Sequence, residues 1–173
     1  MSDQKPFKAL NIAIMTVSDR RTEADDTSGD LLVTRVNDSG HNLTEKVIVK
    51  DDKYKIREIM SRWIADPEVH AVVTTGGTGL TGRDITPESV EPLFDKKMEG
   101  FGEVFRQLSY KFVGTSTMQS RATGGIANAT AIFCLPGSTG ACKDGWDGII
   151  KFQLDINHTP CNLVELMPRF NEK

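Results

Sequence analysis

Residues 72–87 read VVTTGGTGLTGRDITP, and this stretch decides the fold that we expect of the chain. Its first four residues are apolar or β-branched, as in a buried strand. Four glycines follow, which accept positive φ angles and let a ligand approach the backbone closely. Thr86 and Pro87 then supply an N-cap and a first helical residue. The stretch therefore predicts a strand, a binding loop and a helix, in that order.

The glycine-rich loop indicates a phosphate site rather than a known nucleotide motif. Residues 77–82 match G-x-G-x-x-G, but the helix begins too late for a dinucleotide fingerprint, and no Gly-Lys-Ser/Thr follows to make a P-loop. The N–H groups of such a loop form a concave array that suits phosphate. Asp84 beside this array would need Mg²⁺ to bridge it to phosphate. A glycine turn without a ligand is the alternative.

The composition is that of an ordinary soluble globular protein. The chain has 173 residues, 38% hydrophobic and 26% charged, which suits one domain. A net charge of −3 without a Lys/Arg block argues against nucleic acid as a partner. The three cysteines lack the spacing of a zinc site or a disulfide framework. No signal-peptide core and no run of 18 apolar residues is present, so we expect a cytoplasmic protein without a membrane span.

Apolar strands alternate with amphipathic helices along the chain. Strands are expected at residues 10–17, 43–50, 69–75 and 126–135, and helices at 29–39, 56–64, 87–97, 103–111 and 139–152. This alternation predicts a doubly wound, mainly parallel α/β domain. A single domain is expected over residues 1–173, with a core at about 9–156 and an irregular arm at 157–173. Pro92 is expected to kink or shorten the helix at 87–97. Residues 100–102 are expected to interrupt a helix and residues 124–125 to form a hinge or turn.

Polar segments follow several of the predicted strands. Because the carboxyl ends of parallel strands meet at one edge, where ligands bind, residues 18–21, 76–84, 116–121 and 136–139 are expected to line one pocket. Ser18, Asp19 and Arg20 could contact a phosphate or a polar ring edge, although a solvated loop explains them equally well. Asp51 follows the second strand as Asp84 follows the third, so the two carboxylates could come close together. An N-cap role for Asp51 or Asp52 is the alternative.

Five motifs together resemble the molybdopterin-binding family of MogA, MoaB and the gephyrin G domain. They are residues 74–79, 83–88, 100–103, 120–121 and 135–138, and the resemblance runs from about Asn11 to Trp146. Residues 17–21, 25–29, 114–121 and 159–162 look most like the MoaB members of that family. The resemblance implies a Rossmann-like, three-layer α/β fold, trimers that pair into hexamers, and a role in molybdenum cofactor biosynthesis.

Active members of this family adenylylate molybdopterin: its terminal phosphate attacks the α-phosphate of Mg-ATP, and pyrophosphate leaves. By motif position, the resemblance makes Asp84 and Asp51 the catalytic carboxylates, which would hold Mg²⁺ across the nucleotide phosphates. It places the pterin at Thr75, Gly76, Gly77, Thr78, Gly79, Ser109, Ser120, Arg121, Pro136, Gly137 and Ser138. The chain departs from the family at Gly140, where a lysine is common.

Two functions follow from this resemblance. The first is an Mg-ATP-dependent molybdopterin adenylyltransferase, and the second is a non-catalytic molybdopterin-binding or carrier protein of the same pathway. Other molybdenum cofactor biosynthesis proteins are the expected protein partners. A scaffold role would need an exposed apolar stripe or an added module, and the sequence suggests neither. An NAD-type oxidoreductase is disfavoured by the late start of the helix after the glycine loop.

Overall fold

A computed structural model describes residues 4–172 of the chain. Its strands are β1 (Asn11–Val17), β2 (Asn42–Val49), β3 (Ala71–Thr75), β4 (Lys96–Lys97), β5 (Thr123–Ala127) and β6 (Thr130–Leu135). They form one six-stranded sheet in the order β2-β1-β3-β6-β5-β4. Neighbours from β2 to β6 are parallel, whereas β5 is antiparallel to both β6 and β4. The mainly parallel sheet predicted from the sequence is confirmed.

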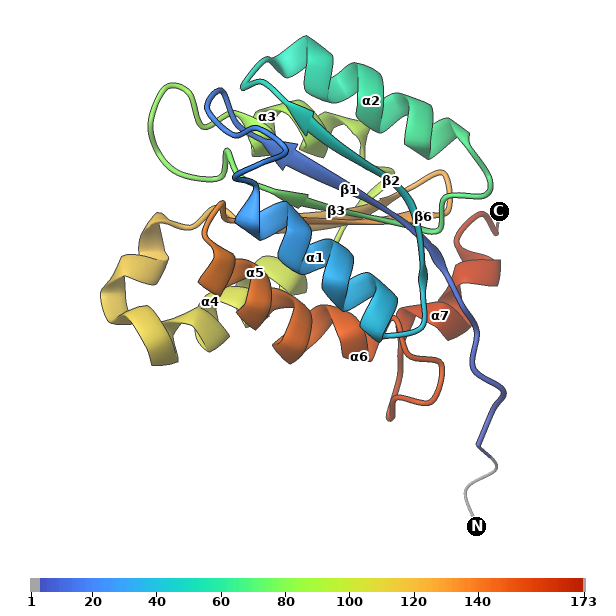
Figure 1. The fold of residues 1–173 in the computed structure, drawn as a ribbon. Coiled ribbons are helices and arrows are strands. Elements are labelled where there is room, and N and C mark those ends of the chain that lie inside the picture. The colour runs from blue at the N-terminus through green and yellow to red at the C-terminus, as the bar shows by residue number, and fades with distance from the viewer. Residues whose placement is uncertain (1–3, 173) are drawn as a thin grey trace.

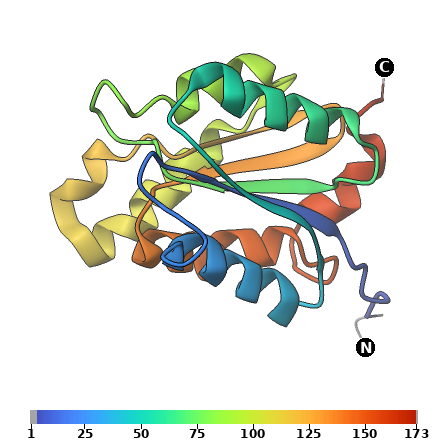
Figure 2. The same ribbon diagram turned by 45° about the horizontal axis from the view of Figure 1, so that its top comes forward.

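Helices cover both faces of this sheet (Figures 1 and 2). One face carries α2 (Lys53–Ala65) and α3 (Thr86–Val90). The other carries α1 (Thr27–Asp38), α4 (Glu99–Val113), α5 (Thr139–Gly145), a π-helical segment (Trp146–Ile150), α6 (Lys151–Gln153) and α7 (Leu163–Leu166). Short 3₁₀ helices occupy Glu91–Leu93, Gly114–Gln119 and Met167–Arg169. The predicted three-layer α/β arrangement is therefore also confirmed.

Two apolar cores, one on each face, hold these layers together. Successive side chains of a strand point to opposite faces, so β1 contributes to both cores. Ile14 joins the core that contains Trp146, and Met15 joins the core that contains Trp63. All four side chains are essentially inaccessible to solvent. The near-continuous apolar run of β1 is therefore the pattern of a strand covered on both sides.

Several glycines that were expected to break a helix or form a turn lie inside a helix or strand. Gly100 and Gly102 belong to α4, where a Cβ on Gly102 would lie 2.5 Å from the carbonyl oxygen of Ala122. Gly125 lies within β5, where a Cβ would lie 2.4 Å from the ring of Phe94. The predicted helix break and the predicted hinge at 124–125 are thus wrong. Gly102 and Gly125 are required by close packing against distant residues, which the local sequence does not reveal, whereas a Cβ on Gly100 would meet nothing within 4 Å.

Pro92 shortens its helix as expected, while other boundaries near turns differ from those predicted. The helix expected at 87–97 ends at Val90, because Pro92 confines the following residues to one 3₁₀ turn before β4. Thr86 is not an N-cap: Ile85 takes that position, and the Thr86 hydroxyl donates to the Gly76 carbonyl at 2.8 Å. The strand expected at 126–135 is instead the β5–β6 hairpin.

The C-terminal segment packs on the body of the same chain. It contains α7, and its Val164 and Met167 are buried in the core beneath α1 and α5. Within residues 4–172, no helix is both long enough and apolar enough to cross a lipid bilayer.

Two histidines hold the start of β1 by accepting hydrogen bonds from consecutive backbone amides. Leu10 donates to Nδ1 of His41 at 3.2 Å, and Asn11 donates to Nδ1 of His70 at 2.9 Å. A protonated imidazole has no acceptor nitrogen, so both contacts require neutral histidine. His70 therefore has a structural role at the start of β1.

Stability should therefore fall in mild acid. Burial lowers the pKa of His41 below 6.5 against the opposing charge of Asp155, and burial together with Lys8 lowers the pKa of His70. Below pH 6.5 the unfolded chain then binds more protons than the folded one, so the stabilisation is complete above that pH and is lost as the pH falls toward the lowered values. Urea unfolding at about pH 7.5 and about pH 5.5 should show a lower midpoint in acid. Combining His41→Gln with His70→Gln should flatten that difference, and equal wild-type midpoints would contradict the assignment.

The β5–β6 turn contains a strained alanine. Asn128 and Ala129 have φ angles of +43° and +69°, which are typical of a two-residue hairpin turn. Ala129→Gly should stabilise the protein by about 1 kcal/mol, because the left-handed conformation costs about that much for a residue with a Cβ. Chemical denaturation measures this change. As a matched control, Ala65→Gly at the end of α2 should be neutral or destabilising, and a destabilising Ala129→Gly would show that the turn carries no strain.

Candidate functional site

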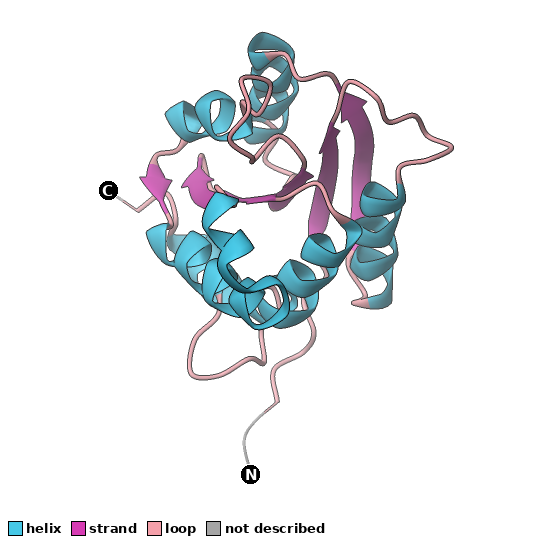
Figure 3. Ribbon diagram, turned by 90° about the vertical axis from the view of Figure 1, so that its left-hand side faces the viewer, coloured by secondary structure: helices cyan, strands magenta, loops and turns pink. Residues whose placement is uncertain are grey.

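The sheet changes its direction of growth between β1 and β3. From β1 the chain crosses through α1 to β2, then returns through α2 on the opposite face to β3, on the other side of β1. The loops that follow β1 and β3 therefore leave toward opposite faces and open a crevice, the usual ligand position in such sheets. These loops lie at the left of Figure 1 and face the viewer in Figure 3.

A cleft of about 660 Å³ occupies this position, and we call it the carboxyl-end cleft. It is walled by the segments that follow β1, β2, β3 and β6 and by the end of α4 with the 3₁₀ helix after it. The sequence-predicted site residues that line it are Ser18, Asp51, Thr75, Gly76, Gly77, Thr78, Gly79, Asp84, Ser109, Ser120, Pro136, Gly137 and Ser138. The expected convergence of four distant segments on one pocket is thus observed.

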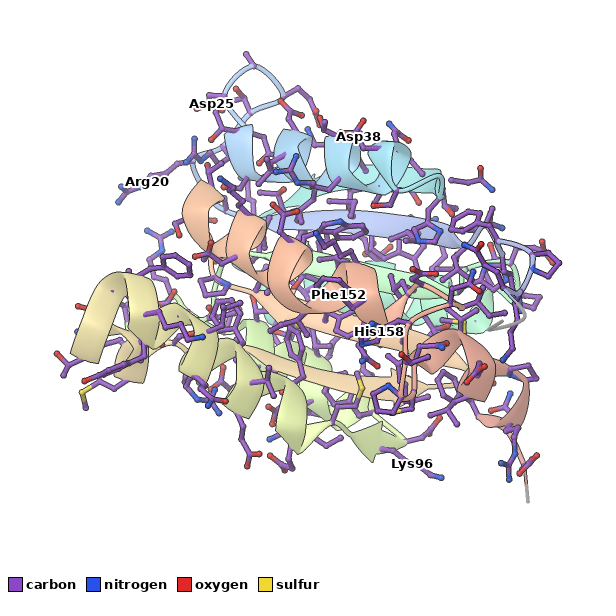
Figure 4. All side chains as sticks on the ribbon, turned by 90° about the horizontal axis from the view of Figure 1, so that it is seen from below. Arg20, Asp25, Asp38, Lys96, Phe152 and His158 are labelled. Carbon is purple, nitrogen blue, oxygen red and sulfur yellow. The ribbon has the colours of Figure 1, made fainter. Side chains whose placement is uncertain are left out.

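Three predicted residues lie outside the cleft lining. Arg20 is exposed and projects outward from the loop after β1 (Figure 4). Asp19 pairs with Arg83, and its Oδ1 accepts the backbone N–H of Asp51 at 3.2 Å. Arg121 directs its guanidinium to the backbone of the glycine loop.

Other lining residues were not named as site residues from the sequence. They are Thr16, Val17, Arg21, Asp26, Ser28, Arg83, Phe105, Phe112, Val113, Ser116, Thr117, Gln119, Gly140, Ala141 and Asp144. Arg21, Arg83 and Gln119 fall in segments that the strand-end rule already indicated. Phe105 and Phe112 gave no such signal, because their spacing on α4 is that of an ordinary core-facing stripe. Both line the cleft, where Phe112 is exposed and Phe105 is almost fully buried.

The glycine loop begins in a conformation that only glycine adopts readily. Gly76 has φ +101°, and a Cβ there would lie 2.2 Å from the carbonyl oxygen of Val17. Gly77 has φ +66°, and its carbonyl accepts the N–H of Thr86 at 2.9 Å. The loop therefore leaves β3 pressed against the end of β1 and is tied to the start of α3.

Asp84 is held as an ionised carboxylate at the far side of this loop. Its Oδ2 accepts from the Thr81 hydroxyl at 2.6 Å and from the Thr81 amide at 2.8 Å. Burial opposes ionisation, but these hydrogen bonds, with one from the Gly79 amide and the charge of Arg121, lower the pKa of Asp84 below its usual value. Asp84 is therefore fully charged at neutral pH.

Asp51 faces the same cleft and interacts with Asp84. Burial, and then the negative charge of Asp84, raise the pKa of Asp51. Its neighbour Asp52 is the N-cap of α2, accepting from the amides of Tyr54 and Lys55, so the open alternative for Asp51 as a cap is excluded. Two carboxylates with opposite pKa shifts thus share one side of the cleft, an arrangement that a divalent cation would stabilise.

The donor set fits Mg²⁺ shared with a phosphate ligand. Mg²⁺ is usually held by one or two carboxylates together with waters and substrate phosphates. Within residues 4–172, no group of three or more His, Cys, Asp or Glu side chains is placed to hold a metal. Asp51 and Asp84 would therefore supply the protein ligands, and a phosphate group the remainder.

Asp26, a third carboxylate in the cleft wall, is neutralised within the chain. It is fully buried, and its Oδ2 accepts from the Thr16 hydroxyl at 2.8 Å and pairs with Lys46 at 3.2 Å. Its Oδ1 caps α1 through the amide of Gly29 at 3.0 Å. Asp26 therefore fixes the start of α1 and carries no free charge for a ligand.

The loop after β6 is anchored to both neighbouring elements. The Ser28 hydroxyl donates to the Gly137 carbonyl at 2.9 Å, and the Thr75 hydroxyl donates to the Pro136 carbonyl at 3.0 Å. Ser138 caps α5 by accepting the amide of Ala141. These contacts give the cleft a rigid floor lined with hydroxyl groups.

Gly79→Ala should displace the Asp84 carboxylate. A Cβ on Gly79 would lie 2.7 Å from Asp84 Oδ2, so the carboxylate must move and lose its bonds from Thr81. Hydrogen exchange at the Thr81 amide should accelerate about tenfold or more, the scale of losing one hydrogen bond to a charged group. Gly82→Ala is the matched control, because nothing lies within 4 Å of a Cβ there. Equal exchange rates in the two variants would contradict this packing.

Comparison with known proteins adds a family to this geometry. Residues 13–155 match the family described as "Probable molybdopterin binding domain". Molybdenum cofactor biosynthesis protein B of Escherichia coli (strain K12) is 54% identical over 156 residues, which cover 90% of this chain and 92% of the relative. A crystal structure of a molybdenum cofactor biosynthesis protein B superposes with a TM-score of 0.84 and 42% identity, covering 87% of this chain and 94% of the other. The tungsten cofactor synthesizing protein MoaB from Pyrococcus furiosus gives a TM-score of 0.76 and 41% identity, with 83% and 91% coverage.

Proposed function

Since this chain belongs to the molybdopterin-binding family of MogA and MoaB, we propose that it binds molybdopterin in the carboxyl-end cleft and adenylylates it with Mg-ATP. The observation that carries the catalytic part is the pair Asp51 and Asp84: both line the cleft beside the glycine loop, and the charge of Asp84 helps to raise the pKa of Asp51. Such a pair suits a transfer between phosphate groups, where most of the catalysis is positioning and charge neutralisation.

The lining of the cleft suits the chemistry of both proposed substrates. It includes the glycine loop, the two aspartates and the cations Arg21 and Arg83. It also includes the exposed ring of Phe112, which suits the planar ring of a pterin or of adenine. This lining supports the ligand chemistry expected from the sequence, a ring system joined to phosphates.

The proposed reaction makes one phosphorus–oxygen bond and breaks another. A terminal phosphate oxygen of molybdopterin attacks the α-phosphorus of ATP, and the bond between the α-phosphorus and its bridging oxygen breaks. Pyrophosphate leaves with the electron pair. Bound Mg²⁺ would neutralise the phosphate charge. Asp51 and Asp84 would hold and orient it, while the guanidinium of Arg21 in the cleft lining would offset further phosphate charge.

One observation favours the alternative of a non-catalytic molybdopterin carrier. Gly140 lines the cleft where the family commonly has a lysine, so this wall lacks one cation. A Cβ on Gly140 would meet nothing within 4 Å, which leaves room for a longer side chain. Gly140→Lys therefore tests the alternative. If this variant gains nucleotide affinity or adenylyl transfer, the missing charge is what limits the wild-type protein to a carrier role.

Asp84→Asn should abolish transfer while molybdopterin still binds. Losing one charge that positions Mg²⁺ should reduce turnover by about 100-fold or more, the scale for groups that stabilise transition-state charge. The assay follows AMP incorporation into molybdopterin together with pyrophosphate release.

Asp52→Asn is the matched control for this variant. It removes the carboxylate that follows Asp51 in the sequence and keeps the α2 cap, because asparagine caps helices as well as aspartate. Unchanged turnover in Asp84→Asn would refute its role. Tight pterin binding without transfer in the wild type would favour the carrier.

Trimers pairing into hexamers, and contacts with other proteins of the pathway, stay predictions of the resemblance. Light scattering combined with size-exclusion chromatography measures the oligomeric state directly.

A further inference from the structure

Arg121 stands behind the glycine loop, on the side away from the carboxyl-end cleft. Its side chain lines a second cavity of about 560 Å³, the side cavity, which also includes Glu88, Glu91 and Arg106. Ser120, the preceding residue, lines both cavities. The guanidinium therefore lies on the far side of the wall that separates the two.

The contacts of Arg121 are made with the backbone of the loop. Nε donates to the carbonyl of Gly79 at 2.8 Å, and Nη2 donates to the carbonyl of Asp84 at 2.7 Å. The backbone N–H of Arg121 donates to the carbonyl of Thr78 at 3.0 Å. One residue thus holds three carbonyl oxygens on both sides of the 80–83 segment.

The positive charge of Arg121 is balanced inside the chain. Its Nη1 pairs with Glu88 on α3, and its side chain is 30% exposed. A guanidinium engaged by two carbonyls and one carboxylate has little charge left for a ligand phosphate. The fork geometry matters here, because a lysine ammonium could not reach both carbonyls with the same rigidity.

The loop needs such a support because its middle is open to solvent. Leu80 is 68% exposed, and the Arg83 side chain, which pairs with Asp19 at the surface, is 70% exposed. The Asp84 carboxylate is fixed to Thr81 within the same loop, so that contact alone cannot place it relative to Asp51. Arg121, from the segment that enters β5, joins the loop to the sheet.

We propose that Arg121 is a positioning residue, whose guanidinium holds the glycine loop so that the Asp84 carboxylate lines the cleft together with Asp51. The catalytic consequence rests on the proposed adenylyl transfer, whereas the holding of the loop does not. This assignment differs from the contact with substrate that the sequence predicted for Arg121.

Arg121→Ala should loosen the loop and slow transfer without weakening substrate binding. Hydrogen exchange of residues 78–84 should accelerate about tenfold or more, while β1 and β3 keep their protection. Displacing a catalytic carboxylate by about 1 Å can cost about 100-fold in turnover, so kcat should fall on that scale. KM for molybdopterin and for ATP should stay within about twofold of the wild-type values, because the variant removes no contact with either substrate. Arg121→Lys should recover only part of kcat.

Arg106→Ala is the matched control. It truncates another arginine of the side cavity, whose Nη1 donates to the Ala122 carbonyl at 3.3 Å, outside the glycine loop. Exchange of residues 78–84 and turnover should both stay at the wild-type level in this variant.

Two results would overturn the inference. One is wild-type exchange of residues 78–84 in Arg121→Ala. The other is a raised KM with unchanged kcat, or full recovery in Arg121→Lys, which would make Arg121 a charged contact for substrate. If the wild type shows no adenylyl transfer, the proposed function fails, and the exchange measurement still decides whether Arg121 holds the loop.

Discussion

The close approach of Gly76 to Val17 is the contact on which the site depends. β1 and β3 are neighbours, and their chains must separate at their carboxyl ends for a cleft to open between them. At φ +101°, Gly76 turns directly beneath the Val17 carbonyl, where a Cβ would lie only 2.2 Å away. The loop that carries Asp84 therefore leaves β3 in a direction that brings it back toward the loop that carries Ser18.

Several charged side chains of the site are paired within the chain, so few of them are available to a ligand. Asp26 is neutralised by Lys46, and Arg121 by Glu88, so neither is available to a ligand. Asp84 is ionised by hydrogen bonds from its own loop, while Asp51 has a raised pKa because of burial and of Asp84. The remaining imbalance is a local excess of negative charge at one side of the cleft, which a cation shared with phosphates would compensate.

Much of the fold followed from local patterns. The apolar run of β1 and the amphipathic spacing of α2 are each a regular local pattern. Both elements lie where these patterns predicted them. The predictions failed at glycines, because a glycine in the sequence can indicate either a flexible turn or a site of close packing. Gly125 reads as a flexible turn, yet it is a strand residue whose missing side chain makes room for the Phe94 ring. A contact across 31 positions leaves no periodic trace.

By itself, the sequence determined the mainly parallel α/β class, the position of the glycine loop after β3, and the membership of a molybdopterin-binding family. Those conclusions rest on strand ends, glycines and motif residues. Such features are recognised from their neighbours along the chain. Only the tertiary structure decided that Asp52 caps α2 while Asp51 faces the cleft, and that Arg121 grips the backbone of the glycine loop. Those outcomes depend on which atoms meet across the packed layers, and a side chain's type and spacing leave that choice open.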